Sequence, residues 1–149
     1  VLCKPGVEGP LSVIAYGAVV FDGEPAYDAI DGQWLTDEPY VLVHRIAVAD
    51  GERGRGVAAE FLHRVETLAQ ERGVKAFRID TNFDNQTMLR LLERTGFTYC
   101  GKVVYRSGER LAYEKRHEKT EPEAPLPGFF HFTVQRVTIF LKKSSRGTL

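Results

Sequence analysis

The chain has little cysteine, no excess of charge of either sign and no long apolar run, and each shortage excludes a class of protein. Two cysteines among 149 residues are too few for a disulfide framework or a zinc site of the usual spacing, and no metal is expected. Twenty basic and twenty acidic residues give a net charge of zero, which argues against a nucleic-acid partner held by bulk charge. No apolar run reaches the roughly 18–20 residues that cross a bilayer, and no signal-peptide pattern opens the chain. We therefore expect a reduced, cytoplasmic protein without a membrane partner.

What is present indicates one folded domain. Apolar residues make up 43% of the chain and charged residues 27%, which is a composition typical of a packed core. Runs of β-branched and apolar residues predict strands, and apolar residues with a period of 3.6 predict amphipathic helices. Together they predict a mixed α/β fold. Its strands are expected at 1–5, 11–21, 40–49, 74–81, 98–105 and 110–117, and its helices at 57–72 and within 82–97.

The most informative stretch is a strand, a turn and a helix at 41–72. Its turn is rich in glycine and carries Arg53 and Arg55. The first turn of a helix has free backbone N–H groups and a partial positive charge, and glycine lets a ligand approach the backbone closely. The stretch therefore predicts a phosphate-binding turn. It matches neither the dinucleotide nor the nucleoside-triphosphate fingerprint, and a purely structural tight turn is the alternative.

This turn resembles the acetyl-CoA pyrophosphate loop of the GNAT N-acetyltransferase superfamily, whose pattern is Q/R-x-x-G-x-G/A. Gly54 and Gly56 fit that pattern, while Gly51 stands at its Q/R position. The pattern N-x-x-A-x-x-x-Y-x-x-x-G-F follows downstream, and the chain fits it at Asn85 and at 96–97. In that second pattern Met88 replaces the usual Ala and Leu92 replaces the usual Tyr. The resemblance covers about residues 1–117.

The resemblance implies a GNAT-like fold, in which a mixed, mostly antiparallel twisted sheet has splayed central strands and flanking helices. It implies acetyl-CoA as co-substrate, with the pantetheine arm between the strands at 40–49 and 74–81. The first of these strands would bind the pantetheine amides with its free backbone groups and polarise the thioester carbonyl. For Arg94, a solvated arginine is the alternative. The cofactor-binding residues implied are Ile46, Ala47, Val48, Arg53, Gly54, Arg55, Gly56, Val57, Ala58, Asn85 and Arg94.

Acetyl transfer to an amine needs a base, and two residues are candidates for this catalytic role. Asp80 lies on the second splayed strand, where some members of the family place a catalytic glutamate. His44 precedes the predicted pantetheine strand, and an imidazole exchanges protons near neutral pH. The alternatives are a structural ion pair for Asp80 and a hydrogen-bonded core histidine for His44. Leu92 cannot replace the family's proton-donating tyrosine, and no other donor is indicated by its spacing.

The acceptor is implied to be a primary amine of a small molecule or of a peptide N-terminus. The segment 22–39 lacks clear periodicity, carries six acidic residues and is expected to be a long loop beside the acceptor cleft. Its acids would attract a cationic amine, and Tyr27 and Trp34 would line the substrate site. The alternative is a solvated acidic loop whose tryptophan covers the core.

The two ends of the chain depart from the family. The first strand and two helices of the family have no counterpart here, and the chain begins at Val1, so we expect a missing N-terminal segment. We divide the chain into a GNAT-like domain at 1–117, a proline-rich linker at 118–128 and a C-terminal strand extension at 129–149. The extension could pair at the edge left by the absent first strand, in this chain or in a homodimer, or beside 97–116.

Two other functions remain open besides the acetyltransferase. The incomplete motifs suit a catalytically weak CoA-binding or assembly module. A structural domain that does not bind CoA is the third possibility, and it would pair the strands at 40–49 and 74–81 along their full length.

Overall fold

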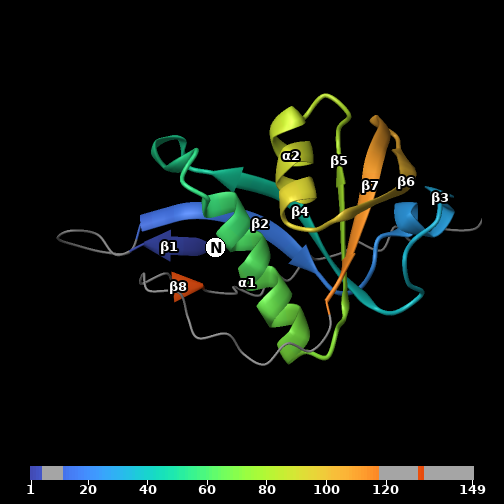
Figure 1. Ribbon diagram of the computed structural model, residues 1–149, viewed down its shortest axis with the longest axis horizontal. Coiled ribbons are helices and arrows are strands. Elements are labelled where there is room, and N and C mark those ends of the chain that lie inside the picture. The colour runs from blue at the N-terminus through green and yellow to red at the C-terminus, as the bar shows by residue number, and fades with distance from the viewer. Residues whose placement is uncertain (5–11, 118–130, 133–149) are drawn as a thin grey trace, which may run out of the picture.

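A computed structural model of the chain describes residues 1–4, 12–117 and 131–132. These residues form one eight-stranded sheet in the order β3-β6-β7-β5-β4-β2-β1-β8, with two α-helices (Figure 1). The strands are β1 (Leu2–Lys4), β2 (Ser12–Val20), β3 (Asp31–Gly32), β4 (Tyr40–Val48), β5 (Ala76–Thr81), β6 (Thr98–Tyr105), β7 (Gly108–Arg116) and β8 (His131–Phe132). The α-helices are α1 (Val57–Glu71) and α2 (Gln86–Arg94), and the 3₁₀ helices are η1 (Pro25–Ala29) and η2 (Asp50–Glu52).

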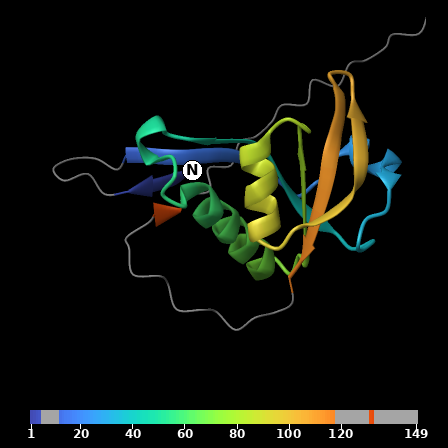
Figure 2. The same cartoon turned by 45° about the horizontal axis from the view of Figure 1, so that its top comes forward.

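The predicted fold class is confirmed. The parallel pair β4–β5 joins two antiparallel halves. The strands predicted at the start and at 98–117 are present, and in each case the two neighbours pair antiparallel. Figure 2 shows α1 over the half that contains β1 and β2, and α2 over the half that contains β5 and β7. The family's mixed, mostly antiparallel sheet is therefore present in the described part of the chain.

Helix α1 forms because its apolar residues share one face. Phe61, Leu62, Val65 and Ala69 are all buried, and their spacing of three and four residues places them on one stripe against β2 and β4. The helix ends at the predicted place, where Gly73 adopts φ 72°. Helix α1 therefore begins at the glycine turn and packs along the core.

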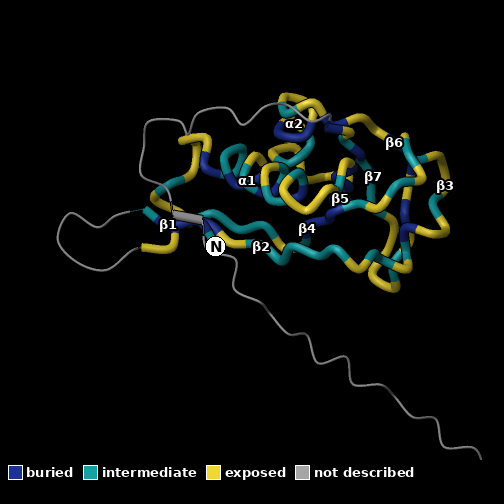
Figure 3. The backbone as a smooth tube through the Cα atoms, turned by 90° about the horizontal axis from the view of Figure 1, so that it is seen from below, coloured by how far each residue is buried: buried dark blue, intermediate teal, exposed yellow. Residues whose placement is uncertain are grey.

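Helix α2 begins directly after Asn85, which caps it. The Asn85 side chain accepts a 3.2 Å hydrogen bond from the backbone N–H of Met88. Leu91 and Leu92 are buried under the helix, and Phe97 packs edge-to-face on Phe77 with ring centroids 5.1 Å apart. Both helices cover the same face of the sheet (Figure 3).

The opposite face is covered by the segment 22–39, which the sequence predicts as a loop without regular structure. It instead contains η1 and β3, and β3 pairs with β6. The close approach of β3 and β6 requires glycine on both strands. A Cβ on Gly32 would lie 2.2 Å from the carbonyl oxygen of Cys100, and a Cβ on Gly101 would lie 2.2 Å from the carbonyl oxygen of Asp31. The backbones therefore touch, and the segment is held against the sheet.

Strands β4 and β5 diverge as predicted. They pair at only three positions, from Tyr40 opposite Ala76 to Leu42 opposite Arg78, and β4 then continues to Val48. Figure 1 shows the two strands starting together and separating toward the start of the two helices. This geometry argues against full-length pairing and against the purely structural domain.

The C-terminal strand is seen in part. Within the predicted strand at 129–143, β8 pairs antiparallel with β1 of the same chain, at the edge named among the expectations. The linker at 118–128 and the remainder of the extension lie outside the described residues, so the domain division and the homodimer stay predictions. Among the described helices, none combines the length and apolar character of a membrane span.

Candidate active site

The turn before α1 leaves the start of the helix open. Gly54 and Gly56 adopt φ 75° and 76°, and a Cβ at either position would meet no described atom within 4 Å. Gly56 is the N-cap of α1 and supplies no side-chain acceptor, so no capping side chain binds the first N–H donors of the helix, at Val57 and Ala58. An uncapped helix start with space before it suits an anionic group such as a pyrophosphate.

The positive charges of the two arginines in this turn are partly compensated by neighbouring carboxylates. Arg53 lies 3.1 Å from Asp50, and Arg55 lies 3.7 Å from Glu52. Glu52 also accepts a hydrogen bond from Lys4, which holds the pKa of that carboxyl below its usual value. Both arginine side chains are about two-thirds exposed or more, so they can turn toward a phosphate ligand.

Strand β4 carries a β-bulge that no sequence pattern predicts. Arg45 adopts φ 57°, the only positive φ among the described non-glycine residues, and the β2–β4 register shifts between Tyr16 and Ala18. A bulge turns backbone groups out of the ladder and commonly occurs beside active sites. The bulge lies just beyond the last β4–β5 pair, and Ile46, Ala47 and Val48 follow it. Their edge toward β5 has no strand partner in the described chain.

A hollow lies beside the same stretch. It is lined by β2 and β4, including Tyr16, Ala47 and Val48, and its walls are mostly apolar. Tyr16 is half exposed and lies opposite Ala47. The bulged part of β4 is therefore accessible on a face of the sheet as well as along its free edge.

The buried side chain of Asp80 is the centre of a hydrogen-bond network. Its Oδ2 accepts from the hydroxyls of Tyr27 at 2.7 Å and Tyr105 at 2.8 Å, and its Oδ1 pairs with Arg110 at 3.2 Å. The Asp80 side chain is only 1% exposed. Burial, followed by the charge of Asp80, raises the pKa of both tyrosines above the ordinary value of 10. Both oxygens of the carboxylate are thus occupied by donors that keep their protons.

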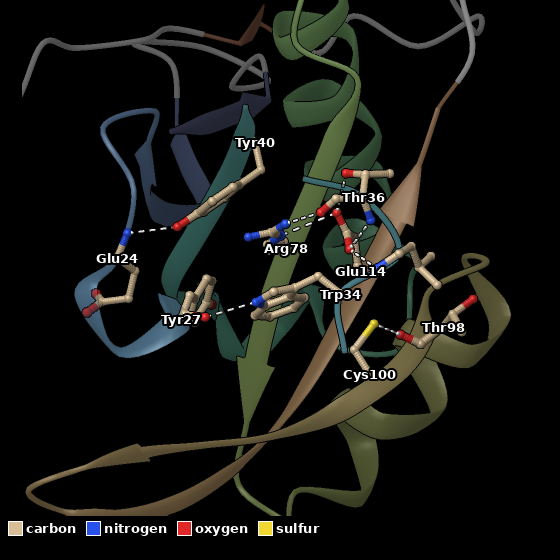
Figure 4. A network of polar contacts seen from close by, with 10 residues as sticks. Glu24, Tyr27, Trp34, Thr36, Tyr40, Arg78, Thr98, Cys100 and Glu114 are labelled. Carbon is tan, nitrogen blue, oxygen red and sulfur yellow. Dashed lines mark hydrogen bonds and ion pairs between the residues drawn. The ribbon is translucent and has the colours of Figure 1, made fainter. Parts of the chain in front are cut away.

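The predicted substrate residues Tyr27 and Trp34 lie within packed structure. Tyr27 is 1% exposed, and the Trp34 indole donates a 3.0 Å hydrogen bond to the Tyr27 carbonyl. Arg78 lies between the rings of Trp34 and Tyr40, 4.3 and 4.1 Å from their centroids. Figure 4 shows this stack beside the buried ion pair of Arg78 with Glu114. The arrangement favours the alternative in which the tryptophan covers the core.

His44 has a carboxylate partner that sequence reasoning missed. Its Nε2 lies 3.2 Å from Oε2 of Glu24, which comes from the acidic segment 22–39. His44 is two residues beyond the last β4–β5 pair and directly before Arg45. Glu24 carries no local signal beyond being one of six acids, because its contact with His44 spans 20 residues of chain.

The remaining predicted residues have mixed placements. The Asn85 oxygen caps α2, while Arg94 is exposed in the last turn of that helix, about 13 Å from Asn85 along the axis. Leu92 is fully buried in the core. Cys100 is buried too, and its burial raises the pKa of the thiol. None of the described residues is thereby identified as the proton donor, and Asn85 and Arg94 stay predictions.

Comparison with known proteins assigns the family. Residues 9–97 match the acetyltransferase (GNAT) family. A GNAT-family acetyltransferase from Streptococcus agalactiae is 43% identical, with a TM-score of 0.63 over 73% of this chain and 61% of that one. One from Listeria monocytogenes is 21% identical, with a TM-score of 0.56 over 72% and 59%. The IAA acetyltransferase from Bacillus cereus is 14% identical, with a TM-score of 0.54 over 74% of both chains.

The chain belongs to the acetyltransferase (GNAT) family. The two relatives at lower identity support the fold alone. The chain spans 61% and 59% of the length of the first two relatives. No curated protein matches it.

Proposed function

We propose that the protein is an acetyl-CoA-dependent N-acetyltransferase, which transfers acetyl to a primary amine of a small molecule or of a peptide N-terminus. The observation that carries this proposal is the geometry of β4. The strand leaves β5 after Leu42, bulges at Arg45 and leads to the uncapped start of α1. One continuous piece of backbone thus offers a free strand edge and then an anion site.

The parts of acetyl-CoA follow one another in the same order as these two features of the backbone. Its pantetheine amides would pair with the free edge of Ile46, Ala47 and Val48, as an added strand does. Its pyrophosphate would accept hydrogen bonds from the amides of residues 53–58, with Arg53 and Arg55 adding charge. Asn85 and Arg94 are the further contacts in this proposal. The thioester would then lie near the bulge, where a backbone N–H can stabilise the developing oxyanion.

The chemistry is an attack of the neutral amine nitrogen on the thioester carbon. The N–C bond forms, the C–S bond breaks, and the sulfur leaves with the bonding electron pair. The amine loses a proton to a base, and the thiolate takes one from solvent. Holding both reactants in place supplies a large part of the rate acceleration. His44 is favoured as the base, since both Asp80 oxygens already accept hydrogen bonds.

The direct test is thiol release from acetyl-CoA by the full-length protein over a panel of small amines and short peptides. Mass spectrometry of the acceptor identifies the product. We expect amine-dependent release well above hydrolysis, and acetylation on nitrogen. If acetyl-CoA binds but its acetyl group is transferred to none of the amines tested, the proposal is contradicted.

A CoA-binding module with little turnover is the second candidate. It is favoured by Leu92, whose buried side chain replaces the hydroxyl that other members use to protonate the thiolate. Both candidates predict affinity for acetyl-CoA, whereas only the enzyme releases thiol in the presence of an amine. The proposal includes a cytoplasmic setting, which the two free cysteines Cys3 and Cys100 support.

A further inference from the structure

We infer that Glu24 and His44 act as a dyad, in which His44 is the catalytic base for the acceptor amine and Glu24 is its positioning residue. The inference rests on the acetyl transfer proposed above and names the groups that accept the proton. Glu24 belongs to no motif of the chain, and its contact with His44 appears only in the folded structure.

The position of the histidine fits the role. His44 lies where β4 has left β5 and immediately before the bulge, so its ring borders the place where the thioester is expected. Its side chain is 28% exposed, which leaves it open to an acceptor. Leu42, two residues earlier on the strand, packs in the cluster with Tyr27 and Val103, on the face opposite the helices. The side chain of His44 therefore points to the same face.

Glu24 is fixed by three contacts. Its backbone N–H donates to the Tyr40 hydroxyl at 3.0 Å. Its Oε1 accepts the backbone N–H of Ala26 at 3.2 Å, which caps η1. Its Oε2 lies 3.2 Å from Nε2 of His44. A carboxylate held in this way has one oxygen committed to the backbone and the other to the imidazole.

This arrangement sets the tautomer of His44. Because the Glu24 carboxylate only accepts, Nε2 carries the hydrogen and Nδ1 keeps its lone pair. In the described part of the chain, Nδ1 has no hydrogen-bond partner. The amine proton would therefore pass to Nδ1 as the N–C bond forms and the C–S bond breaks. The imidazolium, steadied by Glu24, then releases that proton to solvent.

The substitution Glu24→Gln tests the dyad without removing the side chain. The amide oxygen must stay on the Ala26 N–H, so the amide NH₂ would face Nε2 of His44 and donate to it. The hydrogen would then move to Nδ1, and the base would be lost. Nitrogen-15 NMR of the imidazole reports the tautomer directly, with or without turnover. The matched control is Glu109→Gln, which removes an exposed carboxylate paired with Lys102.

We expect the tautomer to be Nε2–H in the wild type and Nδ1–H in Glu24→Gln. The kcat should fall about ten- to a hundredfold in Glu24→Gln and at least a hundredfold in His44→Gln, with little change in the KM for acetyl-CoA. Glu109→Gln should match the wild type. Unchanged kcat and tautomer in Glu24→Gln, in a protein that acetylates amines, would overturn the dyad and leave the proposed function intact. Absence of wild-type turnover with every amine would overturn both.

Discussion

The Tyr27 hydroxyl donates a 2.7 Å hydrogen bond to Oδ2 of Asp80. This contact joins β5 to the segment 22–39, which covers the sheet face opposite the helices. Tyr105 donates to the same oxygen and Arg110 pairs with the other. A carboxylate with three donors and a side chain only 1% exposed is suited to holding structure together.

Asp80→Asn should therefore act on stability more than on the chemical step. The substitution leaves Arg110 without its ionic partner, beside the buried hydroxyl of Tyr27 and the partly buried hydroxyl of Tyr105. We expect a loss of about 3 kcal/mol in the free energy of unfolding, measured by urea denaturation. The kcat per folded molecule should change less than about threefold. A hundredfold fall in kcat at unchanged stability would restore Asp80 as the base.

The same network predicts a pH dependence at the alkaline end. Burial and the neighbouring carboxylate raise the pKa of Tyr27 and Tyr105 in the folded chain, whereas in the unfolded chain both ionise near 10. The stability that the two protonated hydroxyls contribute is thus fully present below pH 10 and is lost as the pH rises above it. We expect Tyr27→Phe to make the fall in stability above pH 10 shallower. An identical slope in wild type and variant would contradict this origin.

The close approach of β3 and β6 predicts a large loss of stability when one glycine is replaced. In Gly101→Ala the new Cβ would lie 2.2 Å from the Asp31 carbonyl oxygen, at a φ of 143°. Neither backbone can move without breaking the β3–β6 pair, so we expect a loss of about 2–3 kcal/mol in unfolding free energy. Gly51→Ala is the control, because its Cβ would meet no described atom within 4 Å. Equal denaturation midpoints for the two variants would show that the close approach is absent.

The glycine turn predicts a specific loss of ligand affinity. Gly56→Glu places a negative charge where the pyrophosphate is expected, and the Kd for acetyl-CoA, measured by calorimetry, should rise at least tenfold. Because Gly56 has φ 76°, Gly56→Asn is the matched control, since asparagine tolerates that conformation. Asparagine should retain most of the affinity. Equal weakening by both side chains would point to backbone strain instead of charge.

The sequence predicts the elements whose causes are local. The buried residues from Phe61 to Ala69 define α1 because they repeat every three or four positions, and α2 lies within the predicted range 82–97. The divergence of β4 and β5 is predicted by the family resemblance and by no local pattern. The bulge at Arg45 is not predicted, because no glycine marks the position; its positive φ accompanies the register shift between β2 and β4.

The site residues that sequence reasoning missed depend on long-range contacts. Tyr27 and Trp34 lie on an acidic segment that suits a substrate site, but Trp34 stacks on Arg78, whose ion-pair partner Glu114 is 36 residues away along the chain. Glu24 meets His44 only once that segment has folded over the sheet. Their separation along the chain is why no spacing rule finds them.

The most direct test of the central claim is amide hydrogen exchange with and without acetyl-CoA. Alternate residues of a strand direct their N–H groups to the same edge, so pairing with pantetheine should protect at least one amide among Ile46, Ala47 and Val48. We predict at least about tenfold slower exchange there and at Val57 and Ala58, with β6 and β7 unchanged. Saturating acetyl-CoA that leaves both stretches unprotected would contradict the claim that the ligand lies along β4 and the start of α1.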